Sequence, residues 1–88
     1  MAKAQDIERA RRFARSIASE LGIYHGKLFD EGIRQDALFE LARVELEAGC
    51  ALYTSRIIPR VDPEQHLYWQ AIVDVVIYPR MRIPSAIW

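Results

Sequence analysis

Apolar residues recur at alternating steps of three and four near the start of the chain, and this spacing constrains the fold more than any other feature. Such a pattern makes an a/d seam along one face of a helix. The seam consists of Ile7, Ala10, Ala14, Ile17, Leu21, Tyr24 and Leu28. It predicts one long helix over residues 5–33, with an apolar stripe that needs a partner surface. Gly22, Gly26 and Gly32 could instead mark a kink, a close helix contact or an early helix end, because glycine weakens a helix interior.

A second helix is predicted over residues 37–57. Asp36 is a suitable N-cap for it, Gly32 a candidate stop for the helix before it, and Pro59 ends it. The turn between the two helices is short, so they should lie antiparallel as a helical hairpin, with facing residue numbers that sum to about 70. That register places Leu28 opposite Ala42, Leu21 opposite Gly49, and Ile17 opposite Leu52 or Tyr53.

A third helix is predicted over residues 63–77, and it is apolar nearly all round. Asp62 would be its N-cap, Pro63 its first residue and Gln65 its capping-box residue. A strand is the alternative for Ile72–Ile77, which is rich in β-branched side chains. The rest of the chain offers no partner strand, so the helix is favoured. An irregular tail is expected over residues 79–88.

The predicted fold is therefore all-α: a single domain over residues 1–88, with a long antiparallel helical hairpin and a third apolar helix. A chain of 88 residues buries only about 60–65% of its unfolded surface. Cys50 is the only cysteine, so no internal disulfide can help. One apolar flank of the third helix would be exposed to solvent in a monomer, which predicts a homodimer or another protein partner. The expected interface residues are Leu67, Trp69, Ile72, Val76, Ile87 and Trp88.

The charge balance excludes a strong global attraction to nucleic acid or membrane. The chain has 12 basic and 12 acidic residues and a net charge of zero. The apolar stretch over residues 67–78 is too short to span a bilayer, and no apolar signal core opens the sequence. A cytoplasmic location is expected, which the lone thiol also favours. Cys50, His25 and His66 do not fall at zinc-ligand spacing, so no metal or cofactor is predicted.

Four arginines near the start are a possible anion contact: Arg9, Arg11, Arg12 and Arg15. Guanidinium groups pair with phosphates, so these side chains could bind nucleic acid. Arg11 and Arg15 share one helix face, however, and Arg9 and Arg12 share another. A solvated helix surface is the favoured interpretation.

No catalytic residues are predicted. His25 with Tyr24 and Glu45 could form an acid–base pair, but no nucleophile or cleft accompanies them, so a structural pair is favoured. Cys50 is mid-helix and is expected to be a small buried hydrophobe rather than a nucleophile. The chain is thus predicted to be a non-enzymatic protein–protein interaction or self-association module. The alternatives are a small nucleic-acid-binding or regulatory protein and an accessory subunit of a larger complex.

The first two predicted helices resemble an uncharacterised bacterial small helical module. The similar residues are Ala10-Arg11-Arg12-Phe13-Ala14-Arg15, Ser19-Glu20, Ile23-Tyr24, Glu31-Gly32, Leu38-Phe39, Glu45 to Glu47, Tyr53 and Arg56. In that family the segment often forms the C-terminal part of zinc-ribbon or signalling-type proteins. The match covers residues 10–56, and the chain departs from it by its third helix and tail. The resemblance implies a fold type and a bacterial source, and no functional residues.

Overall fold

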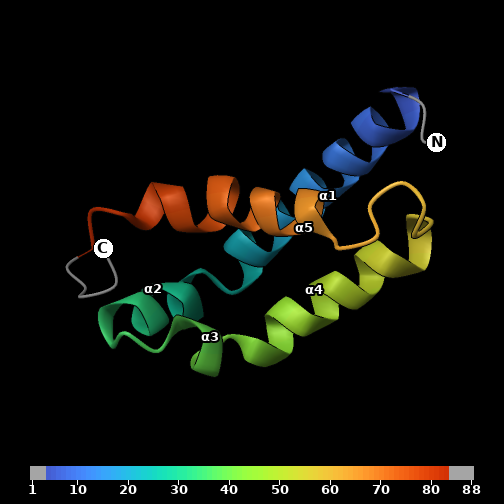
Figure 1. The fold of residues 1–88 in the computed structure, drawn as a ribbon. Helices are drawn as coiled ribbons and strands as arrows, with labels where there is room; N and C mark the ends of the chain where they lie inside the picture. Colours follow the sequence, from blue (N-terminus) through green and yellow to red (C-terminus); the bar gives the residue numbers. More distant parts are fainter. Residues whose placement is uncertain (1–3, 84–88) are drawn as a thin grey trace.

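The computed structural model describes residues 4–83 as a series of helices joined by short connections (Figure 1). No β-strand occurs within these residues, which confirms the predicted all-α class. The strand alternative for Ile72–Ile77 is wrong, because this segment is helical.

The first helix, α1 (Ala4–Tyr24), ends earlier than predicted. The backbone of His25 leaves helical geometry, with φ −125° and ψ 26°, and the chain bends sharply into α2 (Gly26–Arg34) (Figure 1). Hydrogen bonds from His25 N to Leu21 O (2.9 Å) and from Phe29 N to His25 O (3.1 Å) continue across the bend. The single helix predicted over residues 5–33 is therefore wrong: the chain kinks at His25, next to Gly26, whereas Gly22 lies within α1. The bend lets α2 bury Phe29 and Ile33 in the core.

A tight turn follows α2, and the role of Asp36 in this turn differs from the predicted one. Asp36 adopts a left-handed backbone with φ 55°. Ala37 N donates to Gly32 O (2.8 Å) and Asp36 N to Ile33 O (3.2 Å), which is the Schellman pattern of a helix end. Asp36 thus ends α2 and is not the N-cap of the next helix. Gly32 lies inside the last turn instead of stopping it, and a Cβ there would lie 2.9 Å from the Cα of Leu38.

The predicted second helix is divided into α3 (Leu38–Leu41) and α4 (Arg43–Arg56). Ala42 marks the break with φ −101° and ψ 13°, and it is buried. The end of α4 agrees with the prediction, because Ile57 is extended shortly before Pro59. Gly49 on α4 lies against α1: a Cβ there would be 3.1 Å from Leu21 Cδ1 and 3.2 Å from Ile17 Cγ2. The predicted contact of Leu21 with Gly49 is therefore present.

The third helical segment begins later than predicted and changes its winding along its length. It consists of α5 (His66–Ala71), a π-helix η1 (Ile72–Ile77) and a short 3-10 helix η2 (Tyr78–Arg80). Asp62 still caps its start, but from further upstream: Oδ1 accepts from His66 N and Oδ2 from Leu67 N, both at 3.0 Å. Gln65, at φ 55°, is the residue directly before α5.

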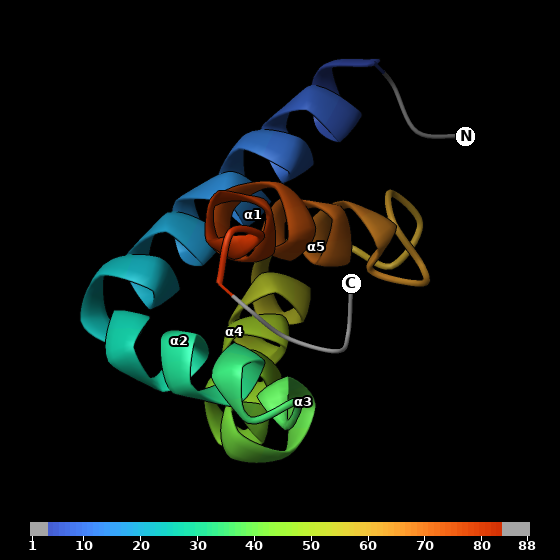
Figure 2. The same cartoon turned by 90° about the vertical axis from the view of Figure 1, so that its left-hand side faces the viewer.

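The third segment crosses α1 and packs against it, with α2, α3 and α4 below it (Figures 1 and 2). It contributes Tyr68, Ala71, Ile72 and Val76 to the buried core. This contact buries one side of the segment, whereas Trp69, Val73 and Tyr78 stay 37%, 46% and 69% exposed, so an apolar flank remains solvent-exposed as predicted.

Two buried tyrosines tie the third segment to α4. Tyr53 donates a hydrogen bond to Asp62 Oδ2 (2.7 Å), and Tyr68 donates to the backbone oxygen of Leu46 (2.7 Å). Their ring centroids lie 5.8 Å apart. The Tyr68 hydroxyl would lie 2.5 Å from a Cβ at Gly49, so this position has no room for any side chain.

Replacement of Gly49 by alanine should therefore destabilise the fold. We expect Gly49→Ala to cost about 2 kcal/mol, because α4 must move away from Tyr68 and weaken its hydrogen bond. Urea denaturation would measure the loss. Gly22→Ala is the matched control: a Cβ at Gly22 meets nothing within 4 Å, so it should stabilise by up to about 1 kcal/mol. Equal effects of the two variants would contradict the packing described here.

The fold should also lose stability at alkaline pH. Burial raises the pKa of Tyr53 and of Tyr68 above the ordinary value of 10.0, and the hydrogen bond to Asp62 raises that of Tyr53 further. The folded state therefore holds these protons more tightly than the unfolded state. The resulting stabilisation is present below pH 10 and is lost as the pH rises above it. Thermal denaturation above pH 10 should show this fall, and the fall should be shallower in Tyr53→Phe. The same slope in that variant would argue against the assignment.

Candidate functional site

The predicted interface on the third segment is largely covered by the chain itself. Ile72 and Val76 are only 2% and 0% exposed, so they cannot contact a partner as predicted, because the segment packs them against the rest of the fold. Leu67 is half-buried against the core. Trp69 stays 37% exposed, and its ring makes a T-shaped contact with that of Tyr68. Ile87 and Trp88 lie outside the described residues.

The four arginines predicted as an anion contact are exposed, but their side chains have different neighbours. Arg11 pairs with Glu8 (2.9 Å), and Arg15 lies 3.9 Å from Asp74 on the third segment. Arg9 lines a hollow of about 290 Å³ at the far end of α4, together with Asp6 and Arg56. No cluster of the four forms, and their role as an anion contact stays a prediction.

The groups considered for catalysis are separate as well. His25 is exposed at the bend, and no hydrogen bond joins it to Glu45 within residues 4–83. Burial raises the pKa of the Cys50 thiol, which disfavours the nucleophilic thiolate. The described part of the chain contains no group of three or more His, Cys, Asp or Glu side chains that could hold a metal ion. It also contains no helix with the length and apolar character of a membrane span.

An apolar groove of about 250 Å³ runs between α1 and α4. We call it the α1–α4 groove; its lining residues are Ile17, Glu20, Leu21, Tyr24, His25, Ala48, Gly49 and Leu52. The α1 residues recur at steps of three and four, so they form one wall, and the α4 residues form the other. Gly49 is buried between the two walls, because Ile17, Leu21 and the Tyr68 hydroxyl fill the space that its side chain would take.

Two large side chains stand out beside this groove. Tyr24 is 77% exposed, although the heptad pattern predicts it to be buried. The bend at His25 explains the difference, because the chain turns away before a partner helix can cover Tyr24. Val44, one turn before Ala48 on α4, is 73% exposed. Exposed apolar side chains gathered around a groove are typical of an interaction surface.

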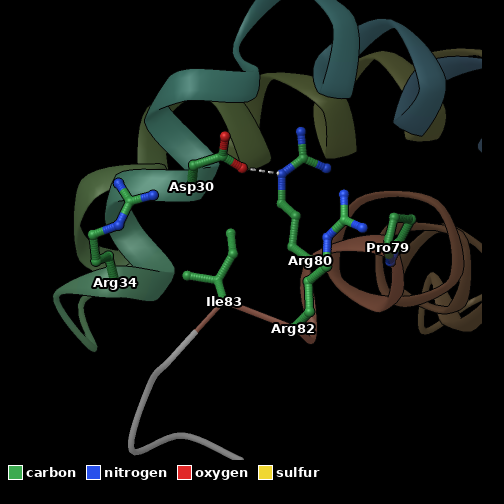
Figure 3. A pocket seen from close by; sticks show the side chains of 6 residues that line it. All are labelled: Asp30, Arg34, Pro79, Arg80, Arg82 and Ile83. Carbon is green, nitrogen blue, oxygen red and sulfur yellow. Dashed lines mark hydrogen bonds and ion pairs between the residues drawn. The ribbon is translucent and has the colours of Figure 1, made fainter.

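A second hollow, of about 410 Å³, lies between α2 and the end of the third segment (Figure 3). We call it the arginine hollow; its lining residues are Asp30, Arg34, Pro79, Arg80, Arg82 and Ile83. Arg80 is 17% exposed and its Nε donates to Asp30 Oδ1 at 2.6 Å. Its Nη1 donates to the backbone oxygen of Val76 at 2.9 Å. The sequence alone did not indicate this site, because Arg80 and Arg82 lie in the predicted irregular tail, far from α2 in sequence.

Comparison of the chain with protein-family models, curated proteins and solved structures gives no match. The resemblance to a bacterial helical module and the cytoplasmic location therefore stay predictions.

The ion pair of Asp30 with Arg80 should stabilise the packing of the third segment on α2. We expect Asp30→Asn to cost about 1–2 kcal/mol, because it leaves a mostly buried guanidinium without its charged acceptor. Glu47→Gln removes the same charge from an exposed pair with Arg43, where the cost should be below about 0.5 kcal/mol. Chemical denaturation of the two variants would compare them. A loss in Asp30→Asn no larger than in Glu47→Gln would contradict a structural role for the pair.

Proposed function

We propose that this protein is a non-enzymatic interaction module that self-associates through the α1–α4 groove. The observation that carries the proposal is the exposed Tyr24 beside an open apolar groove on the same face. A homodimer with two-fold symmetry uses the same patch on both copies. A protruding side chain next to a hollow suits this symmetry, since each copy can place its Tyr24 in the groove of the other.

The chemistry of the groove supports a helical, apolar contact. Its exposed apolar lining consists of Tyr24, Ala48 and Leu52, and Ala48 is small enough to allow close approach. Tyrosine is enriched at the energetic centres of protein interfaces because it buries a large area with few rotatable bonds. A side chain of this size buries about 150–250 Å² when fully covered. Val44 would extend the contact along α4.

The dimer predicted from sequence is thus retained, but its proposed surface moves from the third segment to α1 and α4. The contact between α1 and α4 supplies the groove. Nucleic-acid binding through Arg9, Arg11, Arg12 and Arg15 has less support, because two of these side chains pair with acids on the same chain. The accessory-subunit alternative would use Trp69 and its exposed neighbour Val73.

Solution mass measured by light scattering tests the proposal. We expect a dimer whose mass does not change between low and high salt, because the contact is apolar. Tyr24→Lys should shift the protein towards monomer, since a buried lysine without a partner is costly. A cation in the last turn of α1 is favourable to the helix, so folding should be retained.

Tyr78→Lys is the matched control for this change. Tyr78 is 69% exposed and lies on η2, away from the groove. This variant should keep the mass of the unmodified protein. A monomer at all concentrations of the unmodified protein would overturn the proposal. So would an equal loss of dimer in both variants, and dissociation in Trp69→Lys alone would assign the contact to the third segment.

A further inference from the structure

We infer that the arginine hollow binds an oxyanion group, phosphate or carboxylate, of a small molecule. Three arginines from two parts of the chain distant in sequence line it: Arg34 from α2, Arg80 from the end of the third segment and Arg82 just after that segment (Figure 3). Guanidinium groups are the side chains best matched to the planar and tetrahedral geometry of these anions.

Arg80 is held in place before any ligand arrives. Its Nε donates to Asp30 and its Nη1 to Val76, which fixes the plane of the guanidinium. Nη2 makes no hydrogen bond within residues 4–83. Every buried side-chain nitrogen or oxygen atom of the described residues has a hydrogen-bond partner, so an atom without one is not buried. Nη2 is therefore accessible to solvent. Nη2 lies close to Gly26, at 3.2 Å from the position that a Cβ of this residue would take.

The charge of the hollow is unbalanced in a chain whose net charge is zero. Its lining has three arginines and a single aspartate. Asp30 compensates Arg80, and Glu31, which does not line the hollow, pairs with Arg34 at 3.2 Å. Arg82 forms no ion pair with any acid in residues 4–83. A bound anion would balance this remaining charge and would reduce the repulsion among the three cations.

The shape of the hollow favours a small ligand over a polymer. Its volume of about 410 Å³ falls within the range of about 300–1,000 Å³ that small-molecule sites occupy. Pro79 and Ile83 provide an apolar wall beside the arginines. Nucleic acid would instead need basic groups spread along a surface stripe.

Titration with inorganic phosphate, followed by amide chemical shifts, tests the inference on the unmodified protein. Ionic strength is kept constant with chloride. We expect saturable shifts confined to residues 26–34 and 76–83. A parallel titration with acetate distinguishes the two kinds of anion. Saturation by phosphate alone assigns the site to a phosphate group, and saturation by acetate alone assigns it to a carboxylate. Saturation by both assigns it to either anion.

Arg82→Gln and Arg34→Gln remove charge from exposed positions and should each weaken phosphate binding about tenfold. Arg43→Gln makes the same change on α4, away from the hollow, and should leave the binding constant unchanged. Shifts that do not saturate would overturn the inference. It would also be overturned by shifts that chloride reproduces, or by an equal effect of Arg43→Gln.

Discussion

The hydrogen bond from the Tyr68 hydroxyl to the Leu46 carbonyl is the contact on which the arrangement of the helices depends. It joins the third segment to α4 at the point where α4 also meets α1. A phenol can reach a helix backbone only if the helix presents a gap, and Gly49 provides it. The same missing side chain lets Ile17 and Leu21 approach. Three helices therefore meet at one residue, and the buried Tyr53–Asp62 hydrogen bond secures the turn that delivers Tyr68.

The bend at His25 has a comparable influence at the other end of the molecule. It turns α2 out of line with α1, and this change of direction places Asp30 within reach of Arg80. Both candidate surfaces follow from it. Tyr24 is left uncovered beside the α1–α4 groove, and Arg34 and Arg82 line opposite sides of the arginine hollow (Figure 3).

The sequence was sufficient for the helical class and for much of the core, because apolar periodicity records which faces are buried. Ala10, Ala14 and Ile17 are buried as the heptad pattern predicts, and Leu21 meets Gly49. The breaks at His25 and Ala42 were not predictable in this way. Neither residue is a strong helix breaker, although Gly26, one of the three glycines considered as kink sites, directly follows His25. The capping errors at Asp36 and Asp62 have a related cause: a carboxylate can serve a helix from several positions, and tertiary packing selects one. Both sites depend on side chains brought together by these bends, so the sequence alone could indicate neither.

The π-helical winding of η1 determines the direction in which the side chains after it point around the helix axis. A π-helix closes its hydrogen bonds over one more residue than an α-helix does. Each residue of an α-helix advances the chain by about 100° around the axis. Rewinding the same six residues of Ile72–Ile77 as an ordinary α-helix would therefore rotate Arg80 by about a quarter turn relative to Tyr68. Tyr68 would stay over Gly49 while Arg80 turned away from Asp30. The π-helical turn thus sets the direction of Arg80, and it allows one short segment to contact α4 through Tyr68 and α2 through Arg80.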